Sequence, residues 1–176
     1  MKLIKIKEGQ HLSNQMTGIR FLTNGAIEFD VMFGKQSRYV LGDGDQYDWN
    51  KLYGCSWGFF PLIDSFQMHY NSSRFGWRYI PDTGTYELTP YYYIKGERKF
   101  NSSIKAVLNE NEVYNCTITP LCDHVIYRVT HKDTGSQILY FESEEKVVDY
   151  NGFLAPGYFG GNKRAPRNVS YLFIRL

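Results

Sequence analysis

Residues 69–98 read HYNSSRFGWRYIPDTGTYELTPYYYIKGER. This stretch contains two runs with the character of β-strands, separated by one turn. The turn is Pro81–Gly84, whose proline, aspartate and glycine favour a chain reversal. Because successive side chains of a strand point to opposite faces, the second run separates into two sets. We expect an inward set of Leu88, Tyr92 and Ile94, and an outward set of Glu87, Tyr91, Tyr93 and Lys95. The stretch therefore predicts two long antiparallel strands.

The first run of this stretch does not separate as cleanly. Polar and apolar side chains occur at both odd and even positions between His69 and Tyr79. Gly76 lies inside the run, and a glycine within a strand often marks a bulge that exchanges the two faces. With such a bulge, Arg74 or Arg78 would join the outward tyrosines of the second run.

Strand signals continue along the rest of the chain. They cover residues 2–7, 18–23, 26–33, 37–42, 102–108, 112–120, 124–132, 136–143 and 169–176. Asn24-Gly25 predicts a hairpin turn, and only residues 48–54 are compatible with a short helical turn, capped by Asp48. Many short strands separated by turns are typical of sandwiches and barrels. The sequence predicts an all-β fold, an antiparallel β-sandwich of the jelly-roll type, as a single domain over 1–176.

Composition limits the classes of partner. The chain has 176 residues, a net charge of +2 and 17% aromatic residues, so a nucleic-acid polymer is not the expected partner. The N-terminus lacks a signal peptide and no apolar run could span a bilayer, so we expect no membrane partner and a cytoplasmic location. Cys55, Cys116 and Cys122 are expected to be reduced and buried, with a Cys116–Cys122 disulfide as the alternative.

One face of the predicted sheet is a candidate binding surface. Tyrosine and tryptophan rings stack on sugars or bases, while Arg, Asn and His give directional hydrogen bonds. A second candidate is the segment after Phe159-Gly160-Gly161, where a glycine-rich backbone beside basic side chains can bind an anion. The predicted ligand-binding residues are His69, Asn71, Arg74, Trp77, Arg78, Tyr91, Tyr93, Asn162, Lys163 and Arg164. The alternatives are cross-strand pairs that only stabilise the sheet, or an interface between subunits of a homo-oligomer.

Two stretches resemble known proteins. YFGGNKRAPRNVSYLFIRL, residues 158–176, resembles the last strands of concanavalin-like jelly-roll proteins, in particular alginate and glucuronan lyases. Residues 69–98, with DQYDWNKLYG before them, resemble small jelly-roll proteins of Bacteroidetes and their phages. The lyase resemblance implies proton abstraction next to a uronate carboxylate, for which the candidates are His69, Asn71, Arg74, Tyr91 and Tyr93.

The function predicted from these features is non-enzymatic binding of a saccharide or another small polar or anionic molecule on a concave face. One alternative is a bacteriophage protein, either a virion decoration or fibre component or a factor that sequesters a nucleotide signal. A second alternative is a polysaccharide lyase. No catalytic residue, cofactor or metal ion is predicted, since the acidic segment GDGDQYD at 42–48 reads as a turn rather than a calcium loop.

Overall fold

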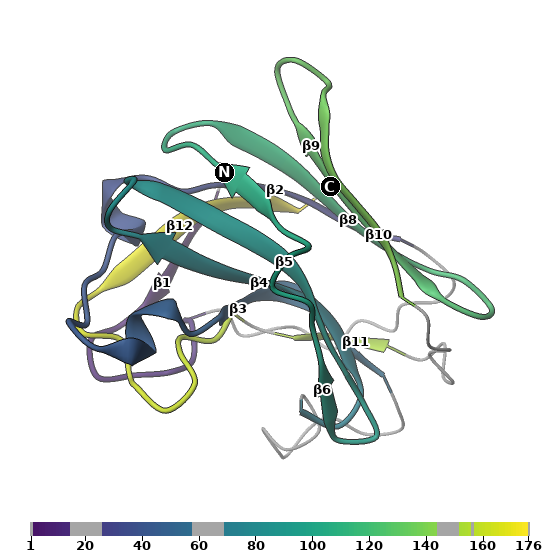
Figure 1. Ribbon diagram of the computed structural model, residues 1–176, viewed down its shortest axis with the longest axis horizontal. Coiled ribbons are helices and arrows are strands. Elements are labelled where there is room, and N and C mark those ends of the chain that lie inside the picture. Colours follow the sequence, from purple (N-terminus) through teal and green to yellow (C-terminus); the bar gives the residue numbers. More distant parts are fainter. Residues whose placement is uncertain (1, 15–25, 58–68, 144–151, 156, 176) are drawn as a thin grey trace.

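The computed structural model describes residues 2–14, 26–57, 69–143, 152–155 and 157–175, which form two stacked antiparallel sheets (Figure 1). The first sheet has the order β1 (Lys2–Ile6), β12 (Val169–Arg175), β2 (Ile27–Met32), β8 (Val113–Pro120), β9 (Val125–His131) and β10 (Gln137–Glu142). The second has the order β11 (Gly152–Ala155), β3 (Asn50–Trp57), β4 (Ser72–Ile80), β5 (Thr85–Ile94) and β6 (Glu97–Lys99), with β7 (Ala106–Leu108) also paired to β5. The predicted jelly-roll β-sandwich is confirmed.

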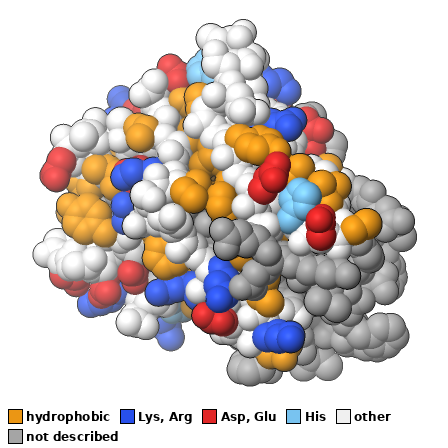
Figure 2. Space-filling model, turned by 45° about the vertical axis from the view of Figure 1, so that its right-hand side comes forward, with side chains coloured by type: hydrophobic (Ala, Val, Ile, Leu, Met, Phe, Trp, Pro, Cys, Tyr) orange, Lys and Arg blue, Asp and Glu red, His pale blue; other side chains and the backbone are white. Residues whose placement is uncertain are grey.

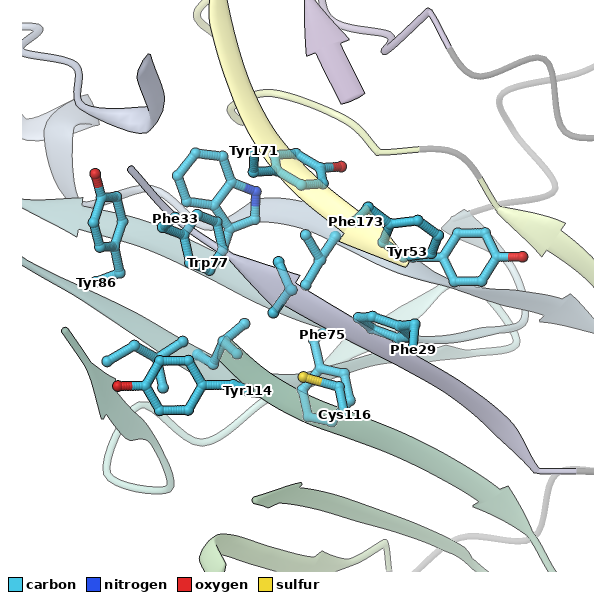
Figure 3. Close-up of a cluster of buried hydrophobic side chains, with 14 of the residues drawn as sticks. Phe29, Phe33, Tyr53, Phe75, Trp77, Tyr86, Tyr114, Cys116, Tyr171 and Phe173 are labelled. Carbon is cyan, nitrogen blue, oxygen red and sulfur yellow. The ribbon is translucent and has the colours of Figure 1, made fainter. Parts of the chain in front are cut away.

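Aromatic side chains from both sheets fill the space between them (Figure 3). Trp77 of β4 is fully buried, and its ring centroid lies 4.9 Å from that of Phe33 and 6.0 Å from that of Tyr171 on β12. Phe75 packs edge-on against Phe29 of β2. Large aromatic rings bury much apolar area each, so this core accounts for the high aromatic content without any ligand.

In the β4–β5 hairpin, the side chains of β5 point to the faces that its alternation predicts. Leu88 is fully buried and Tyr92 packs against the core, as expected of the inward set. Pairing runs without interruption from Ser72 opposite Tyr93 to Ile80 opposite Thr85, so the bulge expected at Gly76 is absent from this pairing. A Cβ at position 76 would lie 3.1 Å from the Tyr91 ring, so the glycine makes room for that ring instead.

The segment before β3 differs from its prediction. The helical turn is a 3₁₀ helix, η2, at Gly44–Tyr47, and its cap is Asp43, whose carboxylate accepts from the Asp45 N–H at 3.0 Å. A second 3₁₀ turn, η1, spans Lys35–Ser37. The strand expected at 37–42 is absent, whereas β3, β6 and β11 were not predicted. The Asn24-Gly25 hairpin lies outside the described residues.

Two smaller expectations can also be compared with the structure. All three cysteines are free, but Cys122 is exposed, so the prediction of burial is wrong for that thiol. Among the described residues, no helix has the length and apolar character needed to cross a membrane.

Candidate functional site

The outer face of the second sheet is the side that points away from the first sheet, and β4 and β5 bend so that this side is hollow (Figure 1). Even-numbered residues of β4 and odd-numbered residues of β5 meet there. Arg74 is opposite Tyr91 and Arg78 is opposite Glu87. Both arginines therefore reach this face without the predicted exchange of faces, because the inward positions of β4 are Phe75, Trp77 and Tyr79.

At one end of the outer face, the charged side chains form ion pairs with one another. Glu87 is 6% exposed and pairs with Arg78 at 2.7 Å and with Lys105. Arg78 also donates to the Tyr47 carbonyl at 2.8 Å and lies 4.3 Å from the centroid of the Trp49 ring. Paired and hydrogen-bonded charges are how proteins accommodate buried ions, so this end has a structural explanation.

The other end holds a buried ammonium group. Lys51 is 5% exposed, and its Nζ donates to the Gly160 carbonyl at 3.0 Å. The Nζ lies 5.1 Å from the centroid of Tyr91 and 5.3 Å from that of Tyr158. Within the part of the chain that the structure describes, no carboxylate lies within ion-pair distance of this ammonium. Burial, and then the charge of Arg74, lower the pKa of Lys51 to about 8.

Further cations and rings surround Lys51. Arg74 is fully buried, and burial lowers its pKa to about 10. His69 stacks on Tyr93, with 5.2 Å between ring centroids, and burial lowers its pKa to about 4, so that it is neutral near pH 7. Arg98 is exposed and lies 5.0 Å from the centroid of Phe100. The site thus combines hydrogen-bonding rings with several positive charges.

Two glycines position this cluster. Gly54 of β3 is opposite Arg74, and a Cβ there would lie 2.2 Å from the Ser73 carbonyl oxygen and 2.7 Å from Arg74 Cα. Gly160 has a φ of +72° and brings its carbonyl oxygen to Lys51, while its N–H donates to Asn50 Oδ1 at 2.5 Å. Gly160 of the glycine-rich segment therefore contacts β3 through both its carbonyl and its N–H.

A pocket of about 230 Å³ opens beside the cluster. It is lined by Tyr47, Asp48, Trp49, Lys51, Arg78, Tyr91, Arg98, Phe100, Ser102 and Gly161. Tyr91 is 2% exposed because Lys51 and Phe100 cover its ring, so the expectation that this tyrosine faces open water is wrong. Tyr93, by contrast, is partly exposed.

The structure brings together four of the predicted ligand-binding residues, namely His69, Arg74, Tyr91 and Tyr93. The rings of Tyr91 and Tyr93 are 5.8 Å apart, and Tyr93 connects them to His69. No sequence pattern pointed to Lys51, Tyr158 or Arg98 as residues of the site. Lys51 lay in the segment expected to be helical, and Tyr158 joins the site through isolated bridges to Leu12 and Lys51.

Three of the predicted residues on the strands have other roles. Trp77 is a core residue, which corrects its assignment to the open face. Arg78 lines the pocket but is paired with Glu87. Asn71 accepts from the Lys95 N–H at 2.8 Å and so stabilises the β5–β6 turn.

The predicted residues after Phe159 lie in an exposed loop. Lys163 Nζ is 3.4 Å from Asp43 and 3.6 Å from Asp45, and Arg164 donates to the Gly9 carbonyl at 3.4 Å. Asn162 is exposed in the same loop. The lysine thus neutralises the acidic turn, and no group of three or more His, Cys, Asp or Glu in the described ranges is placed to hold a metal ion.

Figure 2 shows one face of the molecule, on which basic and acidic side chains are interspersed among apolar ones.

Comparisons with known proteins give similarity of fold alone. No protein-family model and no curated protein matches the chain. The crystal structure of the marine PL-14 alginate lyase from Aplysia kurodai has a TM-score of 0.49 and 14% identity, over 98% of this chain and 80% of the lyase. A structure of Scytalido-glutamic peptidase with a peptide-based transition-state analogue has a TM-score of 0.42 and 10% identity, over 96% of this chain and 72% of the peptidase. At these values neither similarity transfers an activity.

Proposed function

We propose that this jelly-roll protein binds a small anionic molecule, foremost an acidic saccharide, in the pocket beside Lys51. The observation that carries the proposal is the buried Lys51 ammonium, which lies among tyrosine rings without a described carboxylate partner. Burying a charge is costly unless it is paired. A bound carboxylate would supply the missing partner.

The neighbouring charges support an anion rather than a neutral ligand. Burial lowers the pKa of Lys51 most, and the charges of Arg74 and Arg98 lower it further. Asp48 raises this pKa, but less than Arg74 lowers it, so Lys51 still experiences net repulsion from its charged neighbours in the free protein. An anion between Lys51 and Arg98 would relieve this repulsion. At the other end of the face Glu87 already does so for Arg78 and Lys105. The tyrosine rings favour a saccharide, since their flat faces stack on sugar rings.

Thermal unfolding tests the proposal against a panel of ligands. The panel contains glucuronate, galacturonate, mannuronate and their oligomers, neutral glucose, and cyclic nucleotides for the nucleotide-sequestering alternative. A ligand at 100 times its dissociation constant adds about 2.7 kcal/mol of stability. We expect uronates to raise the melting temperature of the wild type and of Lys105→Met, and to lose this effect in Lys51→Met.

Lys105→Met is a matched control because Lys105 lies on the same face but is paired with Glu87. Stabilisation by the cyclic nucleotides instead of the uronates would favour the phage alternative. Unfolding curves that no member of the panel shifts would overturn the proposed function.

A polysaccharide lyase is the second candidate. Burial raises the pKa of Tyr91 well above its usual value, which makes this phenol a poor base, whereas the pKa of Lys51 at about 8 suits proton transfer near neutral pH. In its neutral form Lys51 would take the proton next to the uronate carboxylate. The bond between the ring carbon and the glycosidic oxygen would then break, and that oxygen would take the proton back from the Lys51 ammonium. The products would be a carbon–carbon double bond in the sugar ring and a released hydroxyl. Ultraviolet absorbance of the unsaturated product, present in the wild type and absent in Lys51→Met, would establish this activity.

A further inference from the structure

Asp48 brings a negative charge into the same pocket. It follows η2, and its backbone N–H donates to the Asp45 carbonyl at 3.1 Å. Asp48 lines the pocket together with Lys51, Arg98 and Gly161, and its Oδ2 atom lies beside Gly161. No residue in the described ranges donates a hydrogen bond to the Asp48 carboxylate or forms an ion pair with it. The neighbouring acids Asp43 and Asp45 differ, because Lys163 lies within 3.4 Å and 3.6 Å of them.

The backbone leaves space for this carboxylate. A Cβ at Gly161 would lie 2.5 Å from Asp48 Oδ2, so any other residue at position 161 would displace the side chain of Asp48. The φ of Gly161 lies outside the left-handed region, so backbone conformation does not require glycine there. The glycine at position 161 is therefore explained by the space that the Asp48 carboxylate needs.

We propose that the pocket recognises a hydroxy acid through groups of opposite charge, an inference that rests on the proposed function. Lys51 and Arg98 bind the carboxylate of the ligand, and Asp48 accepts hydrogen bonds from its hydroxyl groups. An ionised carboxylate only accepts hydrogen bonds, so it favours a ligand that offers O–H donors and repels a second negative charge. Sugar acids carry one carboxylate and several hydroxyls on one ring, which makes them the ligand class that fits this arrangement.

The size of the pocket agrees with a single sugar ring. Its volume is about 230 Å³, below the roughly 300–1,000 Å³ of pockets that enclose drug-sized ligands. Ser102 adds a hydroxyl to the lining, and Tyr91 and Phe100 add ring atoms. A longer chain would place one unit here and leave the others outside.

Calorimetric titration with matched ligands tests the inference. Glucuronate, galacturonate and mannuronate are compared with cyclohexanecarboxylate, which keeps the ring and the carboxylate but lacks the hydroxyls. We expect the best uronate to bind the wild type at least about tenfold more tightly than cyclohexanecarboxylate, because a site with a hydrogen-bond acceptor discriminates against a ligand without the donor. Asp48→Asn should remove most of this difference by weakening uronate binding about tenfold, with cyclohexanecarboxylate unchanged or bound more tightly.

Two further variants complete the design. Gly161→Ala should act like Asp48→Asn, because the added methyl group displaces the carboxylate without changing the net charge. Asp45→Asn is the control: it makes the same charge change on an acid paired with Lys163, and it should leave both affinities as they are. Circular dichroism checks that each variant is folded.

The outcomes separate this inference from the proposed function. If no carboxylate ligand binds the wild type, both fail. If uronates bind but cyclohexanecarboxylate binds equally well, or if Asp48→Asn behaves like Asp45→Asn, anion binding stands and the role of Asp48 is overturned.

Discussion

Lys51 extends from β3 over the outer face of the second sheet, and its position sets two properties of the protein. In the unfolded chain this lysine has a pKa near 10.5, and in the folded protein about 8. Below pH 8 the group is charged in both states, so the folded protein bears the cost of burying the charge. Between pH 8 and 10.5 the folded protein loses the proton first, and stability from this group rises with pH. Lys51 therefore destabilises the free protein at neutral pH.

Lys51→Met should stabilise the free protein at pH 7. A pKa difference of this size corresponds to roughly 3 kcal/mol, at about 1.4 kcal/mol per pKa unit. The variant also loses the hydrogen bond to the Gly160 carbonyl, which reduces this gain in stability by about 1 kcal/mol or more. We expect the free energy of unfolding in urea to increase by about 1–2 kcal/mol.

The matched substitution Lys105→Met should have the opposite sign. It removes one partner of the buried Glu87 carboxylate, with an expected loss of about 1 kcal/mol. If both variants lost the same free energy of unfolding, Lys51 would stabilise the fold as Lys105 does. That result would contradict the expectation that the buried Lys51 charge destabilises the free protein.

At the scale of single elements, β3 makes the site possible. Its pairing with β4 shifts between Lys51 and Gly54, and both residues in between, Leu52 and Tyr53, are buried in the core. The irregularity lets Lys51 and Gly54 both lie on the outer face. Gly54 then leaves the space that the side chain of Arg74 occupies.

Gly54→Ala should disrupt this arrangement. The added methyl group would meet backbone atoms, the Ser73 carbonyl oxygen and Arg74 Cα, which cannot move without opening the β3–β4 ladder. We expect a loss of about 2–4 kcal/mol, at the severe end of overpacking substitutions. Gly44→Ala is the control, because nothing lies within 4 Å of its Cβ and its φ is not positive, so its stability should change by no more than about 0.5 kcal/mol. Similar melting temperatures for both variants would contradict the role of Gly54.

Strands β5 and β3 show which structural features can be predicted from the sequence. Regular alternation predicted the faces of β5, with Leu88 and Tyr92 inward. The segment Asp48–Gly54 carries a helix-capping residue and has no alternation, because its irregular pairing puts two neighbouring residues inward, so β3 was read as helical. Tyr158 lies next to Lys51 only through long-range bridges. The burial of Lys51 and the space at Gly161 depend on contacts between residues that are far apart in the sequence. A pattern within one short segment cannot predict such contacts.

For the whole molecule, the two sheets supply a rigid core and the segments over the outer face supply the chemistry. The core is built from aromatic rings that need no ligand (Figure 3). Over the hollow side, η2, the segment after β6 and the residues before β12 narrow the open sheet to one pocket. Arg78 and Glu87 are paired with each other, whereas Lys51 has no ion-pair partner among the described residues. Arg78 and Lys51 both line the pocket, so the pocket lies between the paired charges and the Lys51 ammonium.

The most direct test of anion binding at Lys51 is the affinity for glucuronate, or the best-bound uronate, measured by calorimetry from about pH 6 to pH 9.5. Because the anion binds the charged ammonium and the pKa of the free protein's Lys51 is about 8, affinity should be level below pH 8 and then fall by up to roughly tenfold per pH unit. Lys51→Met should bind weakly and with no such fall. A level wild-type profile across this range, or the same decline in Lys51→Met, would contradict the account.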